Sequence, residues 1–309
     1  MARETLAPRP VPTAPGAGST RIEAAVREQQ RLLAAAAASL EAAGVEDIHQ
    51  ARVAARRLRS LLKTFRPLLE PRRARLYRVD LRSFARALAA VREADVRRDM
   101  LVALVRRNVA ISAADRRQLS VLLEDLCIAA REGLRRHLRE PGWMALRRAL
   151  DRHAASGDAL FVARDATIAR VLTLVDRAWR RPARLMRDEP ASVAELHELR
   201  LALKHCRYAL EPVADLESRA AARLMRRLRA AQDRIGEHRD TLLADHWARL
   251  NERSLGRTLT AHLVADLARQ ERVLRRQAVN RSRKVLPAWR EWRDATRRLR
   301  REAKRDRAG

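Results

Sequence analysis

The sequence predicts an all-α protein, and three observations support this. Ala, Leu and Arg, which are among the strongest helix formers, dominate its 309 residues, and only 9 are glycine. The β-branched residues occur singly rather than in the alternating runs of strands. Apolar residues recur instead at the spacing of helices that bury one side. We therefore expect helices along nearly the whole chain.

Cap and breaker residues mark the helices of the first half. Residues 1–20, rich in Pro, Ala and Gly, are expected to form a disordered tail. The first helix is expected to start after a cap at Ser19 and Thr20 and to end near Ala43, where Gly44 stops it. Further helices are expected over residues 46–69, 72–108, 112–139 (capped by Ser112, with a stop at Pro141 and Gly142) and 143–153.

Ser156 and Gly157 form the clearest break in the middle of the chain. Helical pattern then resumes over residues 158–186, 192–215, 218–253, 257–279 and 284–305. We therefore divide the chain into the tail, a first helical bundle over residues 21–157 and a second over residues 158–309.

Two motif pairs predict an internal duplication. The chain reads IHQARVAARRLRSLLKTF around His49 and LHELRLALKHCRYALEPV around His197, at an offset of 148 residues. One helix later, LAAVREADV (88–96) aligns with IGEHRDTLL (235–243) at an offset of 147 residues. The alignment pairs His49 with His197, Arg52 with Arg200, Arg56 with Lys204, Arg59 with Arg207, Arg92 with Arg239 and Glu93 with Asp240. Each half is therefore expected to be a bundle of about four main helices.

Each first motif predicts a column of cations on one helix face. The spacing 0, +3, +7 and +10 places the His and the three cations within an arc of about 80°, and Lys63 at +14 falls in the same arc. The opposite side is apolar, with Leu58, Leu61, Leu62, Phe65 and Leu69 in the first copy and Leu199, Cys206, Leu210 and Val213 in the second. Any exposed amphipathic helix has a charged face, but the first column holds no acidic residue for ion pairing.

The net charge indicates a polyanionic partner. The chain has 67 Lys and Arg against 38 Asp and Glu, a formal net charge of +29 and a pI near 11.7. Such an excess repels itself and is usually retained because the partner is a polyanion. Most of the cations are Arg, which binds phosphate oxygens through a planar fork and stays charged at any working pH.

Inorganic polyphosphate fits these columns better than nucleic acid does. It carries about one negative charge per phosphate and offers no bases to read, so a dense track of cations is its natural receptor. Proteins that bind single-stranded nucleic acid usually add aromatic stacking platforms. Here Phe65 lies on the apolar side, and Tyr208 has Ser60 as its counterpart in the first copy.

In these motifs the sequence resembles the CHAD domain, the conserved histidine α-helical domain, over about residues 21–305. In that family an H-x-x-R-x-x-x-R/K-x-x-R-like helix begins each half, and an L-G-x-x-R-D-like segment follows one helix later. The second copy matches closely, with LHELRLALKHCRYALE and IGEHRD. In the first copy Ala89 replaces the glycine and Glu93 the aspartate, which concerns the conformation of this turn more than the binding face.

The resemblance implies two antiparallel four-helix bundles related by a pseudo-two-fold axis, with a basic surface at their junction that binds polyphosphate. Some relatives accompany polyphosphate granules. Carried over to this sequence, the binding candidates are His49, Arg52, Arg56, Arg59, His197, Arg200, Lys204 and Arg207. Arg92 and Arg239 are second-tier candidates because each can pair with its neighbouring acid. Lys63 rests on helix geometry alone, and Glu211 occupies its matching position.

The two motif histidines have a structural alternative, since a His near a helix start often caps or packs. If they contact phosphate instead, their pKa should rise and binding should strengthen toward pH 6.

An enzyme is the first rival interpretation. Glu46 and His49 form an E-x-x-H pair, a spacing used by di-metal bundles, but Ala194 occupies the matching position of the second copy. His238 and His246 are eight residues apart rather than four. The sequence contains neither a nucleotide-binding loop nor a nucleophile motif. We therefore expect no catalytic residue, metal or cofactor.

A nucleic-acid-binding protein is the second rival. The last helix is crowded with cations beside Trp289 and Trp292 and could bind any polyanion. These cations are Arg290, Arg293, Arg297, Arg300, Arg301, Lys304 and Arg305.

The remaining signals predict a cytoplasmic protein without a membrane span. Cys127 and Cys206 are far apart in apolar contexts and are expected to be reduced core thiols. No stretch approaches the roughly 20 apolar residues of a transmembrane helix, and the first residues lack the apolar core of a signal peptide. The oligomeric state is left open.

Overall fold

The computed structural model describes residues 14–40, 44–156, 160–188, 190 and 192–305, and nearly all of them are helical, which confirms the all-α prediction. The first half contains α1 (Ala17–Ser39), α2 (Val45–Thr64), the 3-10 helix η1 (Arg66–Leu68), α3 (Pro71–Arg107), α4 (Ala113–Leu138) and α5 (Pro141–Ser156). The second half contains α6 (Ile168–Leu185), α7 (Val193–Leu210), the 3-10 helix η2 (Glu211–Glu217), α8 (Ser218–Leu250), α9 (Glu252–Leu255), α10 (Arg257–Arg283), α11 (Val285–Ala295) and α12 (Arg297–Arg305).

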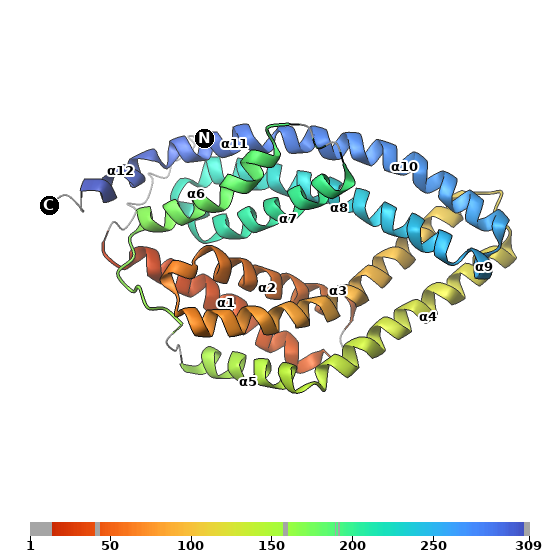
Figure 1. Ribbon diagram of the computed structural model, residues 1–309, viewed down its shortest axis with the longest axis horizontal. Helices are drawn as coiled ribbons and strands as arrows, with labels where there is room; N and C mark the ends of the chain where they lie inside the picture. The colour runs from red at the N-terminus through yellow and green to blue at the C-terminus, as the bar shows by residue number, and fades with distance from the viewer. Residues whose placement is uncertain (1–13, 41–43, 157–159, 189, 191, 306–309) are drawn as a thin grey trace, which may run out of the picture.

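Helices at matching places in the two halves pack on one another. Helix α1 contacts α6, α2 contacts α7, and α3 contacts α8. In Figure 1, α1, α2, the start of α3 and α5 lie in the lower part of the molecule, below α6, α7 and α11. Helices α3, α4, α8 and α10 extend to the end of the molecule where α9 lies (Figure 1). A pseudo-two-fold axis between two halves would produce this pairing, while the duplication and the domain boundaries stay predictions.

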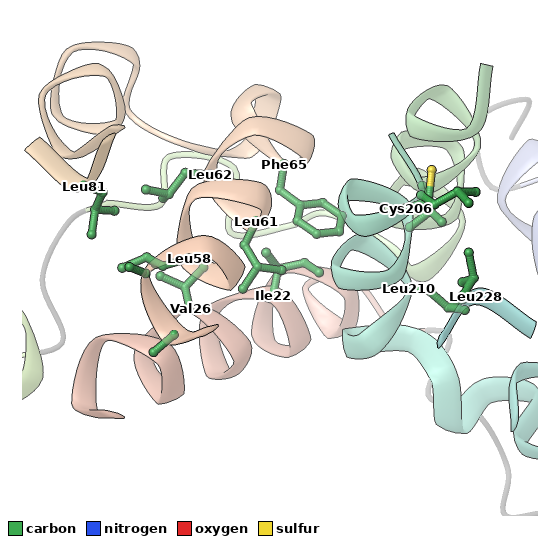
Figure 2. Close-up of a cluster of buried hydrophobic side chains, with 14 of the residues drawn as sticks. Ile22, Val26, Leu58, Leu61, Leu62, Phe65, Leu81, Cys206, Leu210 and Leu228 are labelled. Carbon is green, nitrogen blue, oxygen red and sulfur yellow. The ribbon is translucent and has the colours of Figure 1, made fainter. Parts of the chain in front are cut away.

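Both halves contribute to both hydrophobic cores. The larger core joins α1, α2 and the first part of α3 to α6, α7 and α11. A smaller core lies toward the α9 end and joins the end of α3 and the start of α4 to α8 and α10. Figure 2 shows Phe65, which follows α2, between Ile22 of α1 and Cys206 of α7. The residues predicted on the apolar faces of the two motif helices are all buried, so each helix turns its other side away from this core.

The start of the first helix differs from the prediction. Helix α1 begins at Ala17, so Ser19 lies inside the helix rather than capping it. The Ser19 hydroxyl donates to the carbonyl of Ala163 at 2.6 Å and accepts from the N–H of Ala166 at 3.0 Å. The N–H groups of Gly18 and Ser19 both donate to the carbonyl of Ala166, so the segment before α6 caps α1. Residues 1–13 of the predicted tail lie outside the described residues.

The same segment explains why residues 160–167 are not helical, although a helix is expected from residue 158. The carbonyl of Leu160 accepts from the N–H of Glu70, and the N–H of Val162 donates to the carbonyl of Leu68. Backbone groups bonded to the first half cannot also form a helical ladder. Helix α6 starts only after Thr167, whose hydroxyl accepts from the N–H of Arg170 at 3.4 Å.

Replacing Gly18 by alanine should destabilise the fold. A β-carbon at this position would lie 2.4 Å from the carbonyl oxygen of Thr167 and 2.6 Å from that of Ala166. Because both neighbours are backbone atoms, the capping segment must move, and we expect a loss of ~2 kcal/mol in the free energy of unfolding. The matched control is Gly142→Ala on α5, where nothing lies within 4 Å and alanine should be neutral or stabilising. Urea denaturation followed by circular dichroism measures both, and equal stabilities would contradict the expectation.

Several expected helices are divided. Helices α2 and α7 are followed by η1 and η2, which contain Pro67 and Pro212, residues without the N–H that an α-helical turn uses. Helix α8 gives way to α9 at Asn251, and the last expected helix is divided at Thr296. The hydroxyl of Thr296 donates to the carbonyl of Trp292 at 3.0 Å.

Candidate functional site

The candidate site lies where α2 packs against α7. His49, Arg52 and Arg56 project from α2, and all three are half-buried. From α7 come His197, Arg200, Lys204 and Arg207, which are also half-buried. We call these seven residues the central cation cluster.

The two columns face one another closely enough to interact. The pKa of Arg52 is lowered to about 10. Burial is the largest cause, and the charges of Arg56 and Arg200 follow. The pKa of Lys204 on α7 is lowered by the charges of Arg56 and Arg52 on α2 as well as by cations of its own helix. The structure thus brings the predicted columns together, while the groove expected between them stays a prediction.

Lys204 has the most strongly perturbed pKa of the cluster. Burial, and after it the neighbouring charges of Arg56, Arg200, Arg52 and Arg207, together lower the pKa of Lys204 from the usual 10.5 to about 5. Desolvation and like charges both disfavour the ammonium form. Without an anion, Lys204 is therefore mostly neutral near pH 7.

Several hydrogen-bond donors of the cluster have no partner. The Nε–H groups of Arg52, Arg200 and Arg207 are buried without a hydrogen-bond acceptor among the described residues, and Nδ1 of His49 is buried without a hydrogen-bond partner there. A buried polar group left unpaired costs about 1–3 kcal/mol. An anion with several oxygens would supply acceptors and also reduce the repulsion between the cations.

Tyr208 orders part of the cluster, a role that the sequence analysis missed. Its hydroxyl accepts from Nε of Arg56 and from a terminal nitrogen of Arg207, both at 3.0 Å. The guanidinium of Arg207 lies 4.8 Å from the ring centroid. The hydroxyl thus holds the two arginines in place. Because the ring is fully buried, it is not exposed to stack on a base. The only signal in the sequence was its place beside Arg207.

The second-tier arginines lie at the edge of the cluster. The charge of Arg92 on α3 helps to lower the pKa of His49 and of Arg52. The charge of Arg239 on α8 does the same for His197 and Arg200. Arg239 also forms an ion pair with Glu93 of the other half at 2.9 Å.

The structural alternative for Arg239 is therefore present in the structure. Its neighbouring acid, Asp240, lies 3.7 Å away, and the closer pair with Glu93 links the two halves. Arg92 makes no ion pair with any described residue.

Both motif histidines have a lowered pKa. Burial is the larger cause for each, followed by Arg52 and Arg92 for His49 and by Arg239 and Arg200 for His197. An anion bound among these arginines would offset both effects. The expectation that ligand contact raises their pKa stays a prediction.

Arg59 and Lys63 belong to a different neighbourhood. The charges that act most on Arg59 are Arg82, Arg78 and Arg86 of α3. Those that act most on Lys63 are Arg181 and Arg78. The α2 column therefore continues past the central cation cluster toward α3.

The aspartate-containing motif does not form a turn. Ala89 lies inside α3, and Gly236 lies inside α8. A β-carbon at position 236 would lie 3.0 Å from a terminal nitrogen of Arg200, so glycine allows this guanidinium to rest against α8. Both copies therefore lie inside helices, as expected over residues 72–108 and 218–253, and the glycine makes room for the side chain of Arg200.

The tryptophans of the C-terminal helices are core residues. Trp292 is fully buried and Trp289 nearly so. Trp289 stacks on Trp179 with ring centroids 4.1 Å apart. One of the nearby cations, Arg300, pairs with Asp176 at 2.7 Å. Because Trp289 and Trp292 are buried, neither ring is exposed to stack on a base.

Other sequence expectations can be compared with the described residues. Cys127 and Cys206 are buried and free, as predicted. The Glu46 carboxylate accepts from the amide of Gln50 on the next turn. Within the described ranges, no group of three or more His, Cys, Asp or Glu could hold a metal ion. Nor does any described helix combine the length and apolar character that a bilayer crossing requires.

Comparisons with known proteins give one family and one fold. The model of the CHAD domain matches residues 24–249. The structure of PptA from Streptomyces chartreusis is similar with a TM-score of 0.66 and 21% identity, covering 90% of this chain and 99% of that one. The crystal structure of the CHAD domain from the plant Ricinus communis gives a TM-score of 0.66 and 22% identity, covering 88% of this chain and 96% of the other. No curated protein sequence matches this chain.

Proposed function

Because the chain belongs to the CHAD domain family, we propose that it binds inorganic polyphosphate, without catalysis, through the central cation cluster. Polyphosphate binding is a known property of CHAD domains. The observation that carries the proposal is the meeting of cations from both halves, with buried donors that lack acceptors in the described protein. Arg92 and Arg239 widen this site on the α3 and α8 sides.

Phosphate oxygens match the needs of these side chains. Each arginine presents a fork of N–H groups that suits two oxygens of one phosphate. A polyphosphate chain offers an acceptor at every unit, so one ligand can serve arginines from both helices. A small anion would satisfy one or two of them and leave the others repelling each other.

A cluster without an exposed aromatic partner favours an anion without bases. Tyr208 is buried beneath its arginines, and Trp289 and Trp292 are in the core. Nucleic acid binders that lack sequence preference gain about 1–3 kcal/mol per stacked base from aromatic side chains. Nucleic acid is therefore the second choice for the partner.

Polyphosphate affinity should fall steeply with salt and resist competition by nucleic acid. Releasing counterions from about six phosphates gives a slope of about −4 for the logarithm of the affinity against the logarithm of the salt concentration. Fluorescence anisotropy with labelled long-chain polyphosphate measures this slope. Duplex DNA and RNA should not displace the label at equal phosphate concentration. Displacement by either would contradict specific binding, and a flat salt response would contradict binding by the cluster.

On this proposal the protein works in the cytoplasm and associates with polyphosphate granules. An enzyme would instead release phosphate from polyphosphate. A phosphate-release assay together with metal analysis tests this, and turnover with stoichiometric metal would overturn the non-catalytic role.

A further inference from the structure

A second cationic site lies beside the central cation cluster. A pocket of about 710 Å³ opens between the end of α2, η1 and the first part of α3. This volume is within the usual range of ligand sites, roughly 300–1,000 Å³. Its lining contains six arginines and no acidic residue: Arg59, Arg66, Arg72, Arg75, Arg78 and Arg82. We call it the α2–α3 arginine pocket.

The arginines of α3 form a stripe that faces this pocket. Arg75, Arg78, Arg82 and Arg86 follow one another at spacings of three, four and four residues, which places them within an arc of about 80° on one helix face. The other side of α3 is buried in the larger core through Tyr77, Leu81 and Phe84. The stripe therefore cannot turn inward.

These arginines have little opposite charge around them: among the carboxyl groups of the described residues, that of Glu70 lies near Arg72, and the backbone N–H groups and charges of Arg73 and Arg72 lower its pKa. None of the six that line the pocket makes a side-chain hydrogen bond or an ion pair with a described residue. Some other surface arginines are paired, as in Arg21 with Asp215 and Arg223 with Glu291. The pocket therefore combines six arginines with a lining that holds no acidic residue.

Arg59 is repelled by cations of both the α2–α3 arginine pocket and the central cation cluster. Burial lowers its pKa most, followed by the charges of Arg82, Arg78 and Arg86, and then by Arg56 of the central cation cluster. A residue held between two groups of like charge gains from an anion on either side.

The pocket and the cluster form one track along α2. Arg52, Arg56, Arg59 and Lys63 lie on one face of the helix, and Arg52 and Lys63 are about 16 Å apart along its axis at 1.5 Å per residue. The charge of Arg78 also helps to lower the pKa of Lys63 and that of His205 on α7. Besides its arginines, the α2–α3 arginine pocket is lined by the aliphatic residues Leu62, Pro71, Ala74 and Val79.

We propose that the α2–α3 arginine pocket is a second phosphate-binding segment, which takes the same polyphosphate chain as it leaves the central cation cluster, with Arg59 shared between them. This inference rests on the proposed function and adds a preference for long chains. A chain that spans both segments gains from the second without a second bimolecular step, because the first contact raises its local concentration. A tripolyphosphate is too short to span both.

The test is the variant R75Q/R78Q/R82Q, which removes charge from the pocket and leaves the central cation cluster intact. Its affinity for polyphosphate of about 100 phosphates should fall by about 10- to 100-fold. Its salt slope should become shallower by about 2, since three phosphate contacts are lost. Its affinity for tripolyphosphate should stay within about twofold of the parent protein, because the short chain is held by the cluster. The matched control R135Q/R136Q/R139Q removes the same charge from exposed positions at the end of α4 and should keep the parent values.

Each outcome of this experiment decides the inference. Unchanged long-chain affinity in the pocket variant, with the parent protein binding normally, overturns the second segment and leaves the proposed function standing. An equal loss for tripolyphosphate, or for the control variant, also overturns it. A loss seen only with single-stranded DNA would make the pocket a nucleic acid surface. If the parent protein binds neither polyphosphate, the proposed function and this inference both fail.

Discussion

Replacing Arg52, Arg56, Arg200 and Lys204 together by alanine is expected to weaken polyphosphate binding at least ~10³-fold while the protein stays helical. Each charge-assisted hydrogen bond to a phosphate contributes about 1.5–3 kcal/mol, and tenfold in affinity corresponds to about 1.4 kcal/mol. The fold should survive because these cations repel one another and none is buried in the hydrophobic cores. Anisotropy titration and circular dichroism measure the two effects.

A control separates the site from the overall charge. The variant R135A/R136A/R139A/R253A also removes four positive charges, from exposed positions on α4 and α9. It should keep its affinity within about threefold, since charges outside the site act mainly through screened, long-range attraction. Strong binding by the folded cluster variant, or an equal loss in the control, would contradict the proposed site.

Two half-variants test whether the columns act together. Changing only Arg52 and Arg56, or only Arg200 and Lys204, should weaken binding without changing the number of chains bound per protein. Two independent sites would instead give two binding stoichiometries, with each half-variant losing one site and keeping the other.

Polyphosphate affinity should rise as pH falls, and Lys204→Met should remove much of this dependence. In the free protein the pKa of Lys204 is about 5, and a bound polyanion raises it toward its usual value near 10.4. Between these values binding takes up a proton, so the affinity increases by up to tenfold for each pH unit lowered. We expect at least a tenfold gain in the parent protein from pH 8.5 to pH 6.5.

The methionine variant should keep only the part of this gain that His49 and His197 supply. The pKa of each histidine is lowered from 6.5 in the free protein, so an anion that raises it adds to the gain toward pH 6. The matched control, Lys284→Met, changes an exposed lysine at the end of α10 and should keep the full pH profile. A flat profile in the parent protein, or an unchanged one in Lys204→Met, would show that Lys204 does not take up the proton.

The same substitution should stabilise the free protein. Because the folded-state pKa of Lys204 lies below its unfolded value, the unfolded chain binds more protons between about pH 5 and pH 10. The stability of the parent protein therefore rises with pH across this window, and the lysine costs most at its acid end. Methionine has no such cost and fits a largely buried position, so we expect a gain of ~2 kcal/mol in the free energy of unfolding at pH 7. Affinity and stability thus change in opposite directions, which distinguishes a binding residue from a structural one.

The sequence alone determined the fold class and the two faces of the motif helices. Helix-forming composition and apolar spacing are local properties, and they placed Leu58 of α2, Phe65 directly after this helix and Leu210 of α7 in the core, where the structure has them. A face that must be buried leaves the opposite face for the cations. The same local reasoning failed at residues 160–167, because their backbone bonds to the distant residues Ser19, Leu68 and Glu70.

Only the tertiary structure decided which cations share a neighbourhood. Helical spacing puts Arg59 and Lys63 in line with Arg52, yet the charged neighbours of Arg59 come mainly from α3 and those of Lys63 from α6 and α3, whereas Arg52 faces Arg200 of α7. The packing of α2 between α3 and α7 creates this difference, and so does the place of Tyr208 beneath two arginines. Electrostatic and desolvation energies depend on the distances between groups and on their burial. A residue pattern along one helix specifies neither the distances to other helices nor the burial of each side chain.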